Sequence, residues 1–333
     1  MKKILFVANY KPHGGGICVQ VDTLRTHLRV CGVETALCST GGGVWKRLLL
    51  PFRLVAVGWR CPVWHIHTCS YRGFLSAVAG LAIGRLLRKR CVVTYHGGDC
   101  ERFFADSPWA PRWLRLADCN TAPTACIAGV FARYGVLCSV VPNVADFQYH
   151  PRAGRMALKP SFICTRHLQW PYNIPVIIQA FSEVQRNYPQ ATLTLVGDGR
   201  DRQSLERMVM ELGLRNVRFA GQVEHTRMVE ILEKNDIFVS ASLIDNMPLS
   251  FLEANACGCL VIASNVGGVP EMVHDRETGL IFEPHRANEL TGAMLWALRH
   301  PAESLGMIDR AGEDMDRYHW ENIKKWLFSA YGI

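Results

Sequence analysis

The sequence has no hydrophobic run long enough to cross a membrane. Its longest uncharged apolar stretch, 73–84, falls well short of the ~20 residues that a transmembrane helix needs. The apolar run Ile4–Ala8 is broken by Asn9 and is shorter than the ~7–15 residues of a signal-peptide core. Hydrophobic residues make up 49% of the chain and charged residues 20%, which excludes a disordered tail. We therefore expect a globular protein that stays in the cytoplasm.

The sequence also lacks the patterns of a disulfide framework and of a metal site. Its 13 cysteines are odd in number and include no Cys-x-x-Cys pair. We interpret them as reduced thiols, mostly in the core. No His, Glu and Cys cluster has metal-ligand spacing, and Asp314-Met315-Asp316 lies far from any predicted strand end. We assign that motif to a solvated helix face and expect no metal ion and no cofactor.

Positive charge is concentrated in the first part of the chain. Residues 1–150 contain 18 Lys and Arg against 7 Asp and Glu, whereas residues 151–333 contain 19 against 22. Such an excess suits nucleic acid, an anionic membrane surface or a phosphorylated substrate. The basic half has no recognisable module in which aromatic residues alternate with basic ones, so we expect no nucleic-acid partner.

Short β-branched runs alternate with amphipathic stretches, which is typical of βαβ units in parallel sheets. The length of 333 residues favours two domains, and the charged, Pro- and Gly-containing segment 150–155 is the expected linker. We predict an α/β protein with two doubly wound sheets, over 1–150 and 151–315, followed by a C-terminal segment 316–333. Ligands of such sheets bind at the carboxyl ends of the strands, here in a cleft between the domains. The predicted strands are Ile4–Ala8, Glu34–Ser39, Val63–Thr68, Cys91–His96, Cys119–Thr124, Ser139–Val141, Ser161–Thr165, Ala191–Gly197, Val217–Ala220, Ile237–Ala241, Leu260–Ala263 and Gly279–Phe282.

The last stretch, Trp320–Tyr331, is predicted to be a helix. Its apolar stripe contains Ile323, Trp326, Leu327 and Ala330. The spacing leaves open whether this helix packs on the second domain or crosses back to the first.

Segment 242–258 is the most informative part of the sequence. Asp245 and Asn246 are candidate helix caps, Pro248 suits a first helical turn, and Gly258 suits a helix stop. A helix that begins there would present free amides to a diphosphate. Glu253 would then accept hydrogen bonds from sugar hydroxyls. An ordinary capped helix with one paired glutamate is the alternative.

Other loops converge on the same predicted edge. Gly197 and Gly267 each follow a predicted strand and keep the backbone free of Cβ bulk. Residues 11–16 follow the first strand, but they lack the spacing of a dinucleotide-binding loop and the ending of a P-loop. His96 ends a strand of the basic half and could hydrogen-bond a substrate hydroxyl or transfer a proton. Arg166 could stabilise a leaving diphosphate, or form a surface ion pair.

Taken together, these residues resemble the retaining glycosyltransferases of family 4. The resemblance covers nearly the whole chain and rests on the order and spacing of its motifs. These are Gly14–Gly16, His96-Gly97, Val141-Pro142-Asn143 with Asp146, Thr165-Arg166, Gly197-Asp198-Gly199, Phe219-Ala220-Gly221, the segment 245–258, residues 266–271, Thr278-Gly279-Leu280 and the Trp320 tail.

The resemblance implies the GT-B fold, in which two Rossmann-like domains face a cleft. It implies a nucleotide diphosphate sugar donor held by the second domain, with Arg166, Asp245 and His96 as catalytic residues. The other residues it assigns to the donor site are Glu253 on the ribose, Asn246, Leu249 and Ser250 near the diphosphate, Gly15 and Gly16, Gly197, Gly267, and Val223 near the base. The final helix would cross back to the first domain.

Two positions depart from the family pattern. The family has Glu-x7-Glu, whereas the first acid here is Asp245, and Tyr172 stands where a lysine commonly follows the arginine. The leaving diphosphate would lose one cation, for which Arg200 or Arg202 could compensate.

We predict a retaining, metal-independent sugar transfer from the nucleotide donor to a hydroxyl of a lipid-linked or glycan acceptor. A non-catalytic nucleotide-sugar-binding subunit and a sugar-nucleotide epimerase or hydrolase of the same fold remain open alternatives.

Two segments of the first domain mix basic and bulky apolar residues, 45–54 and 85–90. Both suit peripheral binding to an anionic membrane. Core-facing helices with solvated basic flanks are the alternative.

Overall fold

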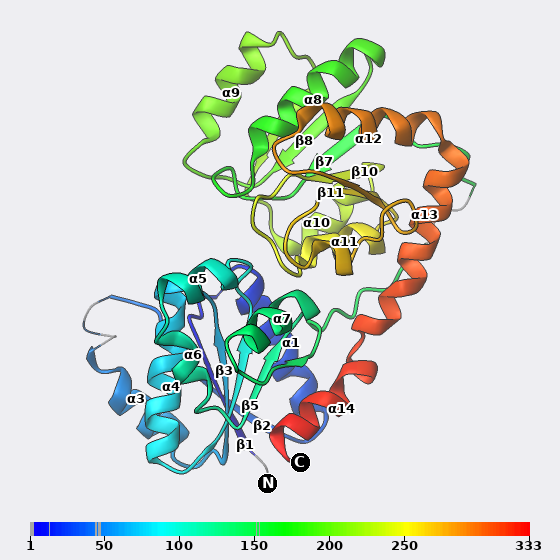
Figure 1. Ribbon diagram of the computed structural model, residues 1–333. Coiled ribbons are helices and arrows are strands. Elements are labelled where there is room, and N and C mark those ends of the chain that lie inside the picture. The colour runs from blue at the N-terminus through cyan, green and yellow to red at the C-terminus, as the bar shows by residue number, and fades with distance from the viewer. Residues whose placement is uncertain (1–2, 13, 44, 46–47, 151, 153) are drawn as a thin grey trace. The chain divides into compact units, whose positions relative to one another are not determined.

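The computed structural model describes residues 3–12, 14–43, 45, 48–150, 152 and 154–333, and it divides them into two compact units. Unit 1 comprises residues 1–146 and 317–333, and unit 2 comprises residues 147–316 (Figure 1). Parts of three predictions, at His13, at Lys46 and Arg47, and at linker positions 151 and 153, lie outside the described residues.

Unit 1 is built on a parallel six-stranded sheet with the order β2-β1-β3-β4-β5-β6. Its strands are β1 (Lys3–Ala8), β2 (Glu34–Ser39), β3 (Val63–Thr68), β4 (Arg90–Tyr95), β5 (Cys119–Ala122) and β6 (Ser139–Val140). Its helices are α1 (Gly16–Val30), α3 (Leu50–Gly58), η1 (Tyr71–Phe74), α4 (Leu75–Leu86), α5 (Cys100–Asp106), α6 (Ala110–Leu114), α7 (Ala125–Arg133) and α14 (Trp320–Tyr331).

Unit 2 is built on a second parallel six-stranded sheet, with the order β12-β11-β10-β7-β8-β9. Its strands are β7 (Ser161–Cys164), β8 (Thr192–Val196), β9 (Val217–Gly221), β10 (Ile237–Ser240), β11 (Leu260–Ser264) and β12 (Leu280–Phe282). Its helices are α8 (Ile174–Asn187), α9 (Arg202–Glu211), α10 (His225–Leu232), α11 (Leu249–Ala256), η2 (Val269–Glu271), α12 (Ala287–Arg299), α13 (Pro301–Glu313) and η3 (Asp314–Tyr318), which ends in unit 1.

The twelve predicted strands are confirmed, each to within two residues at either end. One end is wrong by two residues, because the strand predicted over 119–124 stops at Ala122 and Thr124 is the N-cap of α7. The buried runs in β1, β3 and β4 have apolar side chains on both faces, which is expected of strands covered by helices on both sides.

Each sheet has a topological switch point, where the strand order changes direction. In unit 2 the order, read from β9, is the Rossmann order 3-2-1-4-5-6, and its switch point lies between β7 and β10. In unit 1 the order is 2-1-3-4-5-6, so the switch point lies between β1 and β3. Ligands of open α/β sheets bind outside the strand ends at these points, which selects the loops described below.

Helix α14 packs in the core of unit 1. Its buried Trp320, Ile323 and Leu327 join α1 side chains and one face of β1 in a single apolar cluster. The prediction that Trp326 belongs to this stripe is wrong, since its side chain is 56% exposed. Residue 326 lies about 100° around the helix from Leu327, beyond the buried face.

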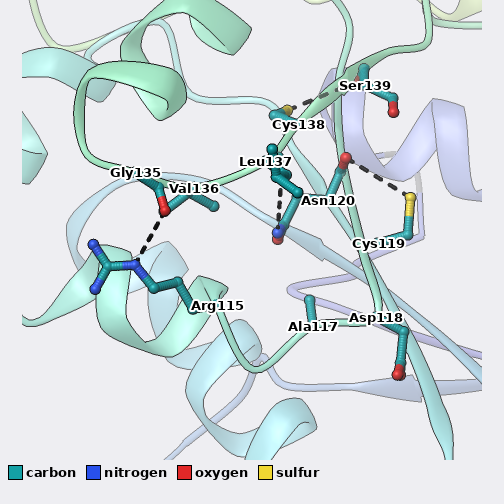
Figure 2. Close-up of a pocket in the computed structure, with 10 residues that line it drawn as sticks. All are labelled: Arg115, Ala117, Asp118, Cys119, Asn120, Gly135, Val136, Leu137, Cys138 and Ser139. Carbon is teal, nitrogen blue, oxygen red and sulfur yellow. Dashed lines mark hydrogen bonds between the residues drawn. The ribbon is translucent and has the colours of Figure 1, made fainter.

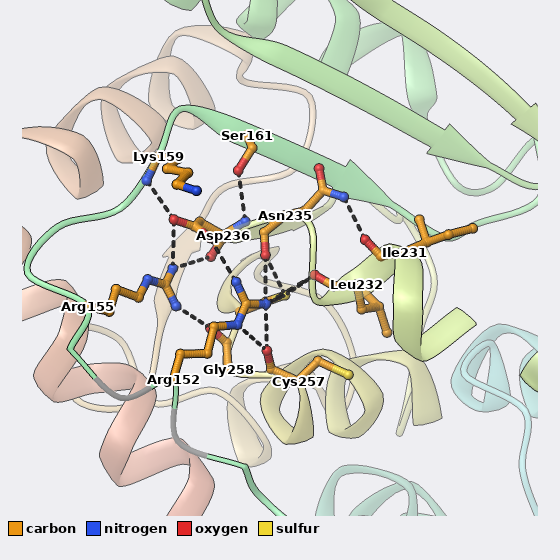
Figure 3. Close-up of polar contacts among 11 residues, drawn as sticks. Arg152, Arg155, Lys159, Ser161, Ile231, Leu232, Asn235, Asp236, Cys257 and Gly258 are labelled. Atoms are coloured by element: carbon orange, nitrogen blue, oxygen red, sulfur yellow. Dashed lines mark hydrogen bonds and ion pairs between the residues drawn. The ribbon is translucent and has the colours of Figure 1, made fainter. Parts of the chain in front are cut away.

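In unit 2, α8 and α12 pack side by side on one face of the sheet, and α10 and α11 lie on the other (Figure 1). The amino ends of the strands are held by an arginine network (Figure 3). Arg152 donates to the carbonyl of Cys257 at 2.6 and 2.8 Å and to Oδ1 of the buried Asp236 at 2.8 Å. Arg155 donates to the carbonyl of Gly258 at 2.7 Å. These bonds pair the carbonyls at the end of α11, whose other end belongs to the candidate site.

The 13 cysteines are free, and most of them are buried. In the part of the chain that the structure describes, no helix combines the length and the apolar character of a membrane span.

Candidate functional site

The switch point of unit 2 brings together two of the predicted catalytic residues. Arg166 follows β7 and Asp245 follows β10, the two strands on either side of the switch point. The Arg166 Nη2 atom donates to Oδ2 of Asp245 at 2.5 Å, and both side chains are largely buried. The second carboxylate oxygen, Oδ1, accepts a hydrogen bond from the Asn246 amide at 3.1 Å. This geometry fixes the guanidinium at the carboxyl edge of the sheet.

Two aromatic rings hold the Arg166 guanidinium from its sides. Its central carbon lies 5.4 Å from the Tyr172 ring centroid and 5.5 Å from that of Phe251, distances typical of cation–π contacts. The Tyr172 pKa is raised by burial, which outweighs the opposing effect of the nearby Arg166, so its hydroxyl stays protonated at neutral pH. Tyr172, at the position where the family commonly has lysine, therefore supplies a ring and a neutral hydroxyl rather than a charge.

Helix α11 begins at Leu249 beside this arginine, since Phe251 is in its first turn. The prediction that Asp245 or Asn246 caps the helix is wrong: Pro248 is the N-cap residue, and no side chain caps it. The physical reason is that Asp245 pairs with Arg166 instead. The amides of Leu249 and Ser250 lie in the first turn, where no intrahelical hydrogen bond uses them. Their N–H groups therefore point out of the helix end and can bind an anion. Gly258, with φ +64°, ends the helix as predicted.

Polar side chains gather at the N-terminal end of α11. Ser250 Oγ is buried and has no hydrogen-bond partner among the described residues. Asn246 is 4% exposed, and Glu253 is half-buried one turn further along α11. A hydroxyl, free amides and a carboxylate thus follow one another along a single helical turn, an arrangement that fits a diphosphate followed by a diol.

Two glycines let the loops approach one another closely. At Gly267, with φ +52°, a Cβ would collide with the carbonyl oxygen of Asp245. At Gly197, with φ +130°, it would collide with the carbonyl oxygen of Arg166. Glycine is therefore required at both positions by close packing and by the backbone angle. Both fix the loops that carry the ion pair, while Val223 lies half-buried in the loop between β9 and α10.

Arg202 is not a spare cation for this site. Its Nε donates to Glu206 at 2.8 Å, and its Nη1 lies 3.9 Å from the Asp198 carboxylate. The expectation that it compensates for a missing lysine is therefore not supported by its contacts.

The remaining predicted residues are in unit 1. Gly15 is the N-cap of α1 and Gly16 its first residue, in the loop that follows β1 at the switch point. A Cβ at either position would meet nothing within 4 Å, so packing inside unit 1 does not require glycine there. At Gly14, by contrast, a Cβ would lie 2.5 Å from the Cys18 sulfur. The open space at 15 and 16 is consistent with the approach of a ligand.

His96 directly follows β4, and its amide donates to the Thr68 carbonyl at 2.9 Å. Its imidazole is hydrogen-bonded to His67, with 2.9 Å between His96 Nε2 and His67 Nδ1. Burial lowers the pKa of His96 to about 4, so the ring is neutral at pH 7. A neutral imidazole can hydrogen-bond a hydroxyl, but a group of such low pKa is a weak base.

A cavity of about 580 Å³ lies elsewhere in unit 1, at the amino end of β5 (Figure 2). Its lining includes Arg115, Asp118, Asn120 and Leu137 and none of the predicted site residues. Arg115 donates hydrogen bonds there to the Tyr134 and Gly135 carbonyls. This cavity lies away from the carboxyl ends of the strands, where open α/β sheets bind their ligands.

Sequence reasoning named Tyr172 only as a lost cation and missed two other residues around the site. Phe251 contacts Arg166 together with Tyr172, and His67 is hydrogen-bonded to His96. The alternation of His65 and His67 on a predicted strand, which puts both on one face, was the available signal.

Comparison with known proteins gives a family match for one part of the chain. Residues 150–315 match the family described as glycosyl transferases group 1. The matched stretch is nearly the whole of unit 2. It contains the Arg166–Asp245 ion pair, α11, Gly197 and Gly267, so the candidate site lies inside the matched region.

One curated relative is the GDP-mannose-dependent monoacylated alpha-(1-6)-phosphatidylinositol monomannoside mannosyltransferase of Corynebacterium glutamicum. It is 31% identical over 154 residues, which is 44% of this chain and 40% of the relative. The aligned region is thus less than half of that relative's length.

Two solved structures are similar over the whole chain. Sucrose-phosphate synthase from Thermosynechococcus elongatus has a TM-score of 0.83 at 20% identity, covering 100% of this chain and 98% of that one. Anabaena Alr3699/HepE in complex with UDP-glucose has a TM-score of 0.80 at 18% identity, with both chains fully covered. At these identities the likeness concerns the fold. The two Rossmann-like domains have the GT-B fold, as expected.

Proposed function

We propose that this protein is a retaining, metal-independent glycosyltransferase. It moves a hexose from a nucleotide diphosphate sugar to a hydroxyl of a lipid-linked or glycan acceptor, in the synthesis of a cell-surface polysaccharide or glycolipid. The observation that carries the proposal is the uncapped start of α11 beside the Arg166–Asp245 pair. A positively polarised helix end and a fixed guanidinium, both at the switch point, form a site for a diphosphate.

The chemistry that this site supports is stabilisation of a leaving group. The bond between the anomeric carbon and the diphosphate oxygen breaks, and a bond from the acceptor oxygen to that carbon forms. The acceptor hydroxyl loses its proton to the departing diphosphate oxygen. Negative charge therefore grows on the diphosphate, where Arg166 and the amides of Leu249 and Ser250 stabilise it more strongly as the bond breaks.

The other residues hold the donor and the acceptor. Glu253 accepts hydrogen bonds from the ribose hydroxyls, and Val223 lies near the base. Asp245 orients Arg166 and also faces the donor sugar. Asn246 and Gly267 border the donor. From unit 1, His96 hydrogen-bonds a sugar hydroxyl, while Gly15 and Gly16 leave room for the acceptor and the donor phosphates.

Known relatives support the choice of substrate class. The solved Anabaena structure contains UDP-glucose, and the name of the Corynebacterium relative specifies a GDP-mannose donor and a phosphatidylinositol mannoside acceptor. We infer a nucleoside diphosphate hexose as the donor.

Arginine substitution tests the proposal. In a transfer assay with a panel of nucleotide sugars and acceptors, Arg166→Ala should lower kcat by about 100-fold or more, because it removes charge stabilisation at the leaving group. Arg207→Ala, at an exposed position on α9, is the matched control and should not change it. Activity should persist in EDTA. Donor binding without turnover across the panel would instead favour a non-catalytic subunit.

We further propose that unit 1 binds an anionic membrane surface from the cytoplasmic side, as a peripheral protein. Helix α3 buries Leu50 and Leu54 but leaves Phe52 72% exposed, and Trp59 just after it is 56% exposed. We call the exposed apolar side chains on and beside this helix the α3 surface: Trp45, Leu48, Leu49, Phe52, Val55 and Trp59.

The charge around the α3 surface points to a negatively charged partner. Residues 35–98 contain nine Lys and Arg and no Asp or Glu. Lys89, from the basic end of α4, donates to the Trp59 carbonyl at 2.5 Å, and the exposed Arg60 lies 4.6 Å from the Trp59 ring. Aromatic side chains beside basic ones are typical of membrane-interface contacts, and each basic residue adds ~1 kcal/mol near an anionic bilayer. Helix α4 itself is core-facing, with buried Ala77 and Leu81, so only its end contributes.

Vesicle sedimentation tests the membrane proposal. The protein should bind vesicles that contain phosphatidylglycerol at low salt, and binding should weaken at high salt and with neutral phosphatidylcholine vesicles. The double variant Phe52→Ser and Trp59→Ser should lose this binding. Leu137→Ser, at an apolar position that is 92% exposed elsewhere in unit 1, is the matched control. Equal binding by both variants, or none by the wild type, would overturn the proposal.

A further inference from the structure

Three histidines lie side by side in unit 1, and the proposed reaction uses only one of them, His96. His65 and His67 lie on the same face of β3, and His96 follows the neighbouring strand β4. The His65 and His67 ring centroids are 4.2 Å apart, and the rings of His67 and His96 are nearly parallel. His67 is 1% exposed, so the surrounding groups shield its ring from solvent.

The first of these histidines is fixed by a directional chain of hydrogen bonds. Thr121 donates to the Val93 carbonyl at 3.4 Å, so its oxygen accepts from Thr94 at 2.6 Å. Thr94 in turn accepts from His65 Nε2 at 2.7 Å. His65 Nδ1 is then an acceptor, and the Tyr331 hydroxyl of α14 donates to it at 2.8 Å. Each hydrogen is used once, which leaves His65 no free site for His67.

His67 therefore bonds in one direction only. Its Nδ1 is 2.9 Å from His96 Nε2, while its Nε2 is buried and has no hydrogen-bond partner among the described residues. A cavity of about 20 Å³ adjoins these rings, lined in part by Gln20, Asn143 and Leu327. Burial lowers the pKa of both His67 and His96, so both rings are neutral and one proton lies between them.

Two arrangements of that proton are available. If His96 donated, His67 would carry its own proton on Nε2, where a buried N–H would lack an acceptor among the described residues. If His67 donates, only a lone pair on its Nε2 remains unpaired. Buried N–H groups without an acceptor are rarer in proteins than unpaired acceptors. The second arrangement is therefore favoured.

We propose that His67 is a positioning residue. Its Nδ1 donates a hydrogen bond to Nε2 of His96, so the proton of the His96 ring is kept on Nδ1 of His96. His96 then presents an N–H donor, rather than a lone pair, to a hydroxyl oxygen of the substrate. This role rests on the proposed function, whereas the hydrogen bond itself does not. The proton arrangement and the activity can therefore be tested separately.

Nuclear magnetic resonance tests the proton arrangement without substrate. In protein labelled with ¹⁵N-histidine, long-range proton–nitrogen correlations at pH 7 should show both His67 and His96 protonated at Nδ1. Signals are assigned with His67→Asn and His96→Asn. Protonation of His67 at Nε2, or of His96 at Nε2, would overturn the proposal whatever the activity of the protein.

Variants at His67 test its consequence for turnover. Asparagine places an N–H donor where the histidine has Nδ1, so His67→Asn should keep kcat near that of the wild type. His67→Leu removes the donor and should lower kcat by about 100-fold, with little change in the dissociation constant of the nucleotide sugar.

The matched control is His285→Asn, at an exposed residue with φ +65°, a backbone angle that asparagine tolerates. Equal loss in the asparagine and leucine variants would indicate a merely structural role and overturn the proposal. If the wild type transfers no sugar at all, the proposed function fails, and the spectroscopic result still decides the hydrogen bond.

Discussion

The two units each have a parallel sheet of six strands, yet the carboxyl ends of their strands are built differently. In unit 2, charged side chains and close-packed glycines fix the loops at the switch point: Arg166 with Asp245, and Gly197 and Gly267 against their backbones. In unit 1, neutral histidines lie beneath the strand ends, and the glycines at 15 and 16 have open space around them. Under the proposed function, this difference means that unit 2 holds a strongly charged ligand rigidly, while unit 1 orients hydroxyl groups by neutral hydrogen bonds.

The largest effect on stability should come from the arginine network that supports α11 in unit 2. Arg152→Met removes one of the two guanidinium groups that pair with the buried Asp236, the other being that of Arg155, and takes the Arg152 donor away from the Leu232, Asn235 and Cys257 carbonyls. Because several part-buried acceptors lose this donor at once, we expect unit 2 to lose about 3–5 kcal/mol of stability. Hydrogen exchange followed segment by segment should show faster exchange in β7, β10 and α11, and unchanged exchange in unit 1.

The control for this variant is Arg186→Met, which breaks an exposed ion pair with Glu183 in the same unit. Its effect should be below about 1 kcal/mol. Equal effects of the two variants would contradict the role given to the Arg152 network.

Replacing one glycine with alanine at each switch point compares the two units directly. Gly267→Ala places a Cβ against the Asp245 carbonyl at a left-handed backbone angle, which should cost about 2–4 kcal/mol and displace the Asp245 loop. Gly15→Ala should change the stability by at most about 0.5 kcal/mol, because its surroundings are open. Thermal unfolding and nucleotide-sugar affinity measure both, and a Gly267→Ala protein with wild-type affinity would contradict a rigid unit 2 site.

The pH dependence of stability should separate the units as well. Burial lowers the pKa of His65 to about 3, whereas an unfolded histidine titrates near 6.5. Between these values the unfolded chain binds the extra proton, so the stability of unit 1 is full above pH 6.5 and falls as the pH falls. The slope from His65 is about 1.4 kcal/mol per pH unit.

Hydrogen exchange of β3 and β4 between pH 7 and pH 5, compared with β7 and β10, measures this slope after correction for intrinsic rates. His65→Gln should reduce it. A pH-independent unit 1 would contradict the assignment of buried, neutral histidines.

The sequence was sufficient to predict the sheets, because buried strands of unit 1 and unit 2 are short β-branched runs separated by amphipathic helices. It also placed Arg166 and Asp245 at strand ends, since loops after parallel strands share one edge. It did not predict their mutual ion pair, and it wrongly made Asp245 a helix cap. A carboxylate three or four residues before a helix has the same local pattern in either role, and only the tertiary contact with Arg166 distinguishes them.

The histidine group illustrates the same limit at longer range. Tyr331 and His65 are 266 residues apart, and His67 and His96 are 29 apart. Local propensity contains no information on such pairs, and the alternation of His65 and His67 indicated only a common face. Likewise, the stripe predicted in the last helix was right for Ile323 and Leu327 but wrong for Trp326, because the sequence does not show which surface the helix packs against.

The most direct test of the account is calorimetric titration of the protein with UDP- and GDP-hexoses, comparing the wild type with Glu253→Ala. We predict that the wild type binds at least one of these donors and that the variant loses that binding while unit 2 stays folded, as hydrogen exchange would show. Wild-type affinity in Glu253→Ala, or no binding of any nucleotide sugar by the wild type, would contradict the placement of the donor on α11.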